Sequence, residues 1–203
     1  MAQSFPSGAD QTLTLLQESV RQQVADGYTA LEDIETNLAE RFELPASDPR
    51  RPLVAQLVRD AIEAHRREQA TWPDVTDCDR LDHAFRRLEA AGVVARAHFT
   101  CCQNCGCHEI RDEIAAAQAG GRSVRGYAFF HLQDTERAVA GHALCLSYGP
   151  VDQASPPAAF EAIGRLVIGA LREAGLRPEW NGSAAQRISL PLRWQRWREE
   201  LEG

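Results

Sequence analysis

The strongest constraint on the fold is a change in hydrophobic period near residues 71–79, TWPDVTDCD. Before this stretch, apolar residues recur at helical spacing in three segments, as Leu16, Val20 and Val24 do. After it, helical segments alternate with short strand-like runs. The stretch itself combines a proline with several aspartates and has no period, which is typical of a connector. We therefore predict an all-helical N-terminal extension over residues 1–70 and a second domain over residues 71–203.

The second domain is predicted to have an α+β fold with a largely antiparallel sheet and packed helices. Its first strand is expected at residues 93–100, where apolar and polar side chains alternate. An Asn181–Gly182 pair lies between the last two strand-like runs and indicates a hairpin. The remaining strands are expected at 127–132, 143–148, 177–180 and 187–192, and the helices at 80–91, 109–118 and 157–174.

The charge balance restricts the class of partner. The 203 residues carry a formal net charge of −7. This charge argues against nucleic acid and against an anionic membrane surface as the main partner. The sequence identifies neither a small-molecule nor a protein partner. The N-terminal residues lack the basic and apolar regions of a signal peptide, so we expect a cytoplasmic protein whose thiols stay reduced.

Four of the six cysteines fall within seven residues, in HFTCCQNCGCHEI at 98–110. Cys102 and Cys105 have the Cys-x-x-Cys spacing that lets a tight turn direct two thiolates at one ion. Zinc is the metal expected, because thiolates suit it and it has no redox chemistry. Cys101, Cys107, His98 and His108 are local candidates for further ligands, and Cys78, Cys145 and His131 are more distant ones.

Two other interpretations of the cluster stay open. The thiols follow a predicted strand and precede a predicted helix, and a helix N-terminus favours the thiolate, so they can serve as redox or nucleophilic groups without a metal. Alternatively, they are small apolar groups that line a tight turn, and the protein is a non-enzymatic interaction module. Against packing alone, Cys101 and Cys102 are adjacent and would point to opposite faces of an extended strand.

A second group of polar residues occurs in HLQDTERAVAGH at 131–142. His131 ends a strand-like run, and Asp134 and Glu136 follow it. As functional groups, His131 would be an acid–base residue or a metal ligand and Asp134 would orient it. As structural groups, Asp134 would cap a short helix at 136–140.

Two motifs, FTCCQ-x-CG at 99–106 and GY-x-FFH-x-QDTERAV at 126–139, resemble those of an uncharacterised bacterial family of domains of unknown function. The resemblance extends from Trp72 to Trp194. The helical N-terminus resembles an extension that varies more than the rest of the family's sequence. The resemblance implies no particular reaction. It implies that Cys101, Cys102 and Cys105 form a three-thiolate site completed by His131. It places Cys107, His108 and His142 outside the motif.

We therefore predict a cysteine-thiolate zinc site with the ligands Cys101, Cys102, Cys105 and His131. If this site is catalytic, one coordination position stays open, and His131 or Glu136 transfers protons near a bound water, with Asp134 orienting His131. The chain has no Gly-rich phosphate loop, no Gly-x-Ser-x-Gly and no His-Glu-x-x-His. Nucleotide hydrolysis, serine hydrolysis and zincin chemistry therefore lack support.

Overall fold

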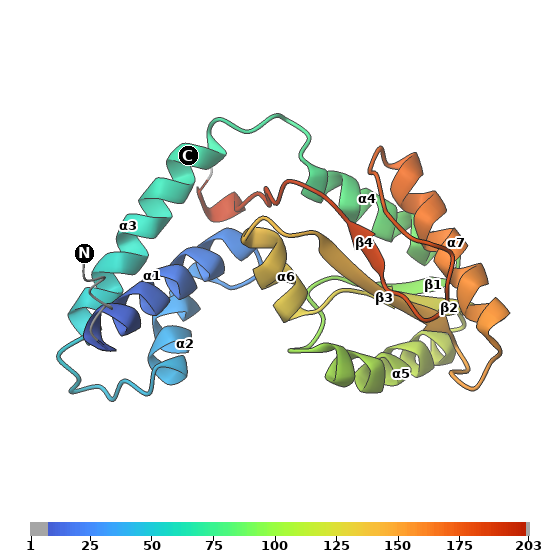
Figure 1. Ribbon diagram of the computed structural model, residues 1–203, viewed down its shortest axis with the longest axis horizontal. Helices are drawn as coiled ribbons and strands as arrows, with labels where there is room; N and C mark the ends of the chain where they lie inside the picture. Colours follow the sequence, from blue (N-terminus) through green and yellow to red (C-terminus); the bar gives the residue numbers. More distant parts are fainter. Residues whose placement is uncertain (1–7, 202–203) are drawn as a thin grey trace, which may run out of the picture. The chain divides into compact units, whose positions relative to one another are not determined.

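A computed structural model describes residues 8–201 and divides the chain into two compact units (Figure 1). The helical unit comprises residues 8–73 together with 196–201, and the α/β unit comprises Asp74–Gln195. The predicted α+β class, with helices at the N-terminus, is confirmed.

The helical unit is built on three amphipathic helices whose apolar faces meet. α1 (Gly8–Asp26) packs against α2 (Ile34–Arg41) and α3 (Arg51–Gln69), and the short helix η1 (Leu31–Asp33) precedes α2. The apolar spacing seen in the sequence forms this core, because residues three and four apart share one helix face. Its buried members are Leu16, Val20, Val24, Ile34, Leu38, Ala39, Leu44, Val54 and Val58.

The end of the chain belongs to this unit because a buried arginine anchors it. Arg198 is 2% exposed and donates hydrogen bonds to the carbonyls of Gln23, Val24 and Thr29 at 2.5–2.8 Å. Its backbone exchanges two hydrogen bonds with the side-chain amide of Gln69. A cation at the carbonyl end of α1 also complements the helix dipole. The segment that carries Arg198, with the short helix η2 (Glu199–Leu201), thereby completes the helical unit.

The α/β unit contains four strands in one mixed sheet with the spatial order β1-β2-β3-β4. β1 pairs with β2 in parallel, and the β2–β3 and β3–β4 pairs are antiparallel. Two of the three pairings are therefore antiparallel, as the sequence predicted. In chain order the elements are α4 (Asp77–Ala90), β1 (Val93–Arg96), α5 (Gln103–Ala119), β2 (Gly126–Phe129), α6 (Leu132–Val139), β3 (Leu144–Pro150), α7 (Pro157–Glu173) and β4 (Ile188–Leu190).

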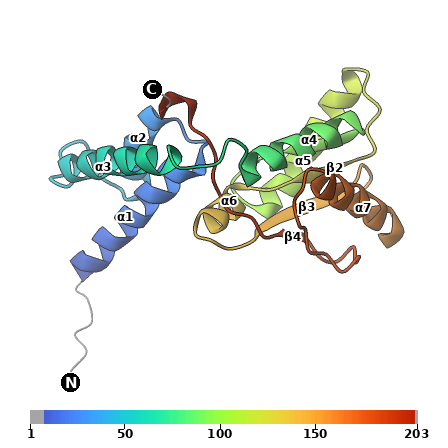
Figure 2. The same cartoon turned by 90° about the horizontal axis from the view of Figure 1, so that it is seen from above.

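Helices cover both faces of this sheet. α4 and α7 contact each other and lie on one face, whereas α5 lies on the opposite face against β1 and β2 (Figures 1 and 2). α6 contacts β3. The parallel β1–β2 pair requires a crossover, and α5 supplies it. This connection places the start of α5 directly after the end of β1.

Four elements differ from the sequence prediction. The helix expected at 109–118 is α5, which begins at Gln103 and therefore contains Cys105 and Cys107. The first strand ends at Arg96 rather than at residue 100, because the following segment leaves the extended conformation. The segment 131–142 contains the helix α6, which begins at Leu132 rather than at residue 136. The expected terminal hairpin is reduced to a bridge between Glu179 and Ser189, and β4 pairs with β3 instead. Within residues 8–201, no helix combines the length and the apolar character that crossing a membrane requires.

We predict that residues 74–195 alone give a folded protein, because the sheet and its four helices lie within this range. A fragment covering 71–203 should be no more stable, since its last residues lose the carbonyl partners of Arg198. Thermal unfolding followed by circular dichroism would compare the two fragments. A fragment 74–195 without a cooperative transition would show that the two units fold only together.

Candidate metal centre

The thiols are presented by a strained turn between β1 and α5. His98 and Thr100 adopt positive φ angles of 50° and 59°, a region that β-branched threonine rarely enters. Two backbone hydrogen bonds hold the turn in place, from Phe99 N to the Phe130 carbonyl at 2.8 Å and from Leu132 N to the Thr100 carbonyl at 3.1 Å. The His98 ring also lies 2.9 Å from the Thr135 hydroxyl. Backbone strain of this kind persists only where neighbouring contacts fix the chain, and it concentrates at functional sites.

The turn ends at Cys102, which is the N-cap residue of α5, and its carbonyl accepts a hydrogen bond from Gly106 N. The Sγ atom of Cys105 lies 3.4 Å from that of Cys101 and 3.6 Å from that of Cys102. All three sulfurs lie within 4.8 Å of one another, and Cys101 is exposed. The bend at Thr100 explains how two adjacent cysteines direct their sulfurs to one point, which an extended strand does not allow.

Close packing of α5 on the sheet requires a glycine at position 106. An added Cβ at Gly106 would lie 2.4 Å from a ring carbon of Phe129, which is fully buried in β2. The glycine therefore lets the first turn of α5 approach the sheet, and this approach fixes where Cys105 stands. Cys105, a candidate ligand, is thus followed directly by Gly106, whose contact with Phe129 positions it.

The three sulfurs influence one another's protonation. The pKa of the Cys102 thiol is lowered, because the backbone N–H of Cys105 faces its sulfur and the Cys105 thiol lies beside it. The pKa of Cys105 is raised to about 12, because its thiol is hydrogen-bonded with those of Cys101 and Cys102 and lies close to any negative charge on them. The three groups therefore do not all ionise at neutral pH without a cation. A bound cation reverses this effect and displaces the remaining protons.

The other three thiols stand apart from this group. Cys107 packs against the apolar cluster that includes Ile110 and Phe129, and burial raises the pKa of its thiol. Cys78 is buried in α4, and Cys145 lies in β3. Among the local histidines considered as ligands, His108 is exposed, and neither it nor His98 joins the three sulfurs within 4.8 Å.

His131, the predicted fourth ligand, is held by other groups. It is the N-cap residue of α6, and its Nδ1 accepts a hydrogen bond from Asp134 N at 3.3 Å. Its Nε2 lies 3.0 Å from the Asp134 carboxylate. Burial lowers the pKa of His131, which keeps the ring neutral. Both ring nitrogens thus have partners within the cap, and the ring is not among the groups that converge with the three sulfurs.

Asp134 forms a second pairing that the sequence did not reveal. Its carboxylate accepts hydrogen bonds from both terminal nitrogens of Arg187, at 3.0 and 2.5 Å, and Arg187 also donates to the carbonyl of Cys145. Glu136, two residues further along α6, is half-buried. The only signal for Arg187 is its position directly before a short apolar strand, with no acidic residue within five positions on either side. Such an arginine needs a partner from elsewhere in the fold.

A family model for a domain of unknown function, DUF6891, matches residues 9–198. The chain belongs to this family. The match includes the N-terminal helices and the segment of Arg198, so it extends beyond the 72–194 region of the sequence resemblance. No curated protein and no solved structure matches the chain. The DUF6891 match therefore establishes the family of the chain and assigns no activity to it.

The two motifs noted in this DUF6891 chain lie side by side. FTCCQ-x-CG forms the strained turn and the start of α5, and FFH-x-QDTERAV forms the end of β2 and the capped start of α6. The hydrogen bonds from Phe99 to Phe130 and from Leu132 to Thr100 join them. The second motif therefore supports the turn that presents the thiols.

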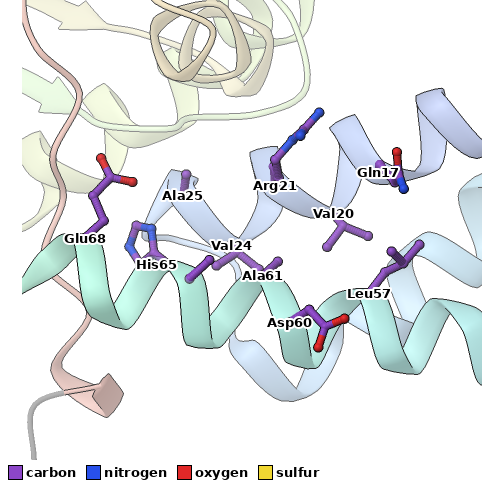
Figure 3. Close-up of a pocket in the computed structure, with 11 residues that line it drawn as sticks. Gln17, Val20, Arg21, Val24, Ala25, Leu57, Asp60, Ala61, His65 and Glu68 are labelled. Atoms are coloured by element: carbon purple, nitrogen blue, oxygen red, sulfur yellow. The ribbon is translucent and has the colours of Figure 1, made fainter.

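The helical unit contains a separate cavity of about 400 Å³ between α1 and α3 (Figure 3). Val20, Val24, Leu57 and Ala61 give it apolar walls, and His65 lies toward the Glu68 end. Burial lowers the pKa of His65, so its ring is neutral. No cysteine lines this cavity, and it has none of the ligand convergence found at the start of α5.

We predict that Gly106→Ala destabilises the protein by about 1–3 kcal/mol, the usual cost of overpacking a core. The new methyl group would meet the Phe129 ring, which is fully buried. Chemical denaturation would measure the loss. Gly169→Ala, in α7, is the matched control, because an added Cβ there has no neighbour within 4 Å. Equal stability of the two variants would contradict the tight contact.

Proposed function

We propose that this DUF6891 chain is a metal-binding protein that holds zinc at Cys101, Cys102 and Cys105. The supporting observation is the convergence of their sulfurs, with Sγ–Sγ distances of 3.4 and 3.6 Å. Zinc binds thiolates at about 2.3 Å in tetrahedral geometry, which separates the sulfurs by about 3.8 Å. The Cys101–Cys105 and Cys102–Cys105 pairs therefore need only a small outward adjustment to reach this spacing.

The position of the site also favours a thiolate-bound cation. The N-terminus of α5 carries partial positive charge from its unpaired N–H groups, which stabilises the net negative charge of a cation with three thiolates. Soft thiolate ligands select zinc among the common divalent ions of the cell, and zinc leaves the thiols unoxidised. This chemistry requires a reducing compartment, and we propose the cytoplasm. Neither nucleic acid nor a membrane surface enters the proposal, given the net charge of −7.

The direct experiment is elemental analysis of protein purified without a metal-chelating tag, together with a titration of free thiols. Zinc near one equivalent, with the three thiols protected, would support the proposal. Absence of metal with six free, unreactive thiols would assign the cluster to packing, consistent with a non-enzymatic module.

A metal-free thiol function is the second candidate. Cys102 has a lowered pKa at a helix N-terminus, and the Cys105 sulfur lies 3.6 Å away. A thiolate in such a position is a good nucleophile, and its neighbour can resolve an oxidised product. This candidate predicts metal-free protein in which a disulfide forms readily on mild oxidation. The same thiol titration distinguishes it from the zinc site.

An acid–base role for His131, Asp134 and Glu136 stays a prediction. The contacts of His131 and Asp134 favour a structural role, because the histidine caps α6 and the carboxylate pairs with Arg187. The zinc proposal therefore uses the three thiols and assigns His131 and Asp134 to positioning the turn.

We predict that Cys105→Ser reduces metal content and melting temperature far more than Cys107→Ser. Cys105 contributes a sulfur to the converging group, whereas Cys107 packs beside apolar side chains. Loss of a thiolate ligand removes affinity that is coupled to folding, on the order of several kcal/mol. Loss of the Cys107 thiol should cost about 1 kcal/mol, a typical effect of a single substitution. Equal losses of metal would instead make Cys107 a ligand.

We predict that the apparent zinc affinity falls as the pH is lowered. With a pKa of about 12, Cys105 is protonated across the accessible pH range, so binding always releases its proton. The association constant should therefore fall by at least about tenfold per pH unit. The dependence should steepen at low pH, where Cys102, with its lowered pKa, also becomes protonated. Competition with a chromophoric chelator between pH 6 and pH 8 would measure it. A pH-independent affinity would exclude thiolate ligands.

A further inference from the structure

The donors available around the three sulfurs define the coordination that a metal would have. All six cysteines and all six histidines of the chain lie within residues 8–201. Across that range, Cys101, Cys102 and Cys105 are the only thiol, imidazole or carboxylate groups that converge within 4.8 Å at this point. A tetrahedral ion bound there uses three of its four positions.

Two candidates for the fourth position, His131 and Cys107, have other neighbours, and neither His98 nor His108 converges with the three sulfurs. His131 has one ring nitrogen bonded to Asp134 N and the other beside the Asp134 carboxylate, which Arg187 also holds. Ligation by His131 would break a buried cap. Cys107 is partly buried against the apolar cluster of Val94, Ile110, Ile114, Tyr127 and Phe129. Cys101 is exposed, so the three-sulfur face borders solvent.

We infer that the metal centre keeps its fourth position open to an external ligand and that this ligand is a small thiol. The inference rests on the proposed function. An open position is the mark of zinc sites that react, whereas structural sites are closed by four protein ligands. The protein would then present a metal-activated thiolate to a second molecule.

A thiol is favoured over water or a carboxylate because the site already contains three soft sulfur ligands. A thiol that coordinates zinc is deprotonated outright. In the binding step the S–H bond of the thiol breaks and its proton passes to the buffer, while a metal–sulfur bond replaces the bond to the solvent molecule that leaves the fourth position. No atom changes oxidation state. The helix N-terminus stabilises the additional negative charge.

Cobalt(II) bound in place of zinc tests the inference on the full chain. Tetrahedral cobalt with thiolate ligands has visible absorption bands that change whenever one ligand is exchanged. The probe is 2-mercaptoethanol, added to the cobalt-loaded protein, and gel filtration then measures the retained cobalt. We expect a saturable change in the bands, with one thiol bound per cobalt and the cobalt retained.

Each alternative result has a defined meaning. Spectra that do not respond to the thiol would overturn the open position while the metal site stands. Cobalt lost on thiol addition would also overturn it, because the thiol would be replacing protein ligands. If the protein binds no cobalt at all, both the proposed function and this inference are wrong.

Two variants separate the possible sources of a fourth ligand. His131→Asn removes the imidazole but keeps a residue that caps helices well. This variant should melt at a lower temperature, because the His131 cap supports the turn, but the folded protein should still bind cobalt and respond to 2-mercaptoethanol. If only His131→Asn responds, His131 is the fourth ligand and the position is closed. Cys107→Ser should also respond like the unaltered protein, and a response that appears only in this variant would make Cys107 the fourth ligand.

Discussion

The arrangement of the α/β unit depends on one buried carboxylate. Asp134 is 2% exposed and faces the backbone N–H and ring of His131 as well as both terminal nitrogens of Arg187. Arg187 in turn reaches the carbonyl of Cys145 in β3. A buried ion pair adds little net stability over an apolar replacement, but removing one partner leaves an uncompensated charge and costs about 3–5 kcal/mol. Asp134 thus links the start of α6, through Arg187, to β3 in the interior of the sheet.

The start of α6 in turn supports the turn that carries the thiols. Leu132 N, in the first turn of α6, donates to the Thr100 carbonyl, and the Thr135 hydroxyl lies beside the His98 ring. Residues in left-handed conformations cost about 1–3 kcal/mol each and need surrounding structure to hold them. The FFH-x-QDTERAV segment provides that structure. His131 and Asp134 in this segment have the chemistry of catalytic groups, but their contacts favour a structural role in supporting the turn.

The sequence was informative where one local property decides the structure. Helical spacing identified the three N-terminal helices, and Cys-x-x-Cys spacing located the converging sulfurs. It failed where a distant contact overrides local preference. Alternation continues through Thr100, but the turn held by Phe130 and Leu132 ends the strand at Arg96. Arg187 and Arg198 find their partners far away along the chain, at Asp134 and at the end of α1. No pattern of neighbouring residues encodes those pairings.

The close spacing of the three sulfurs along the chain determines what a metal would stabilise. Cys101, Cys102 and Cys105 span five residues, so an ion bound by them closes only a short loop and constrains little of the unfolded chain. Its effect is local and falls on the turn whose φ angles are strained at His98 and Thr100. Metal binding and backbone strain therefore act on the same few residues. An ion held there offsets the cost of the turn, and the turn holds the three sulfurs close together before the ion arrives.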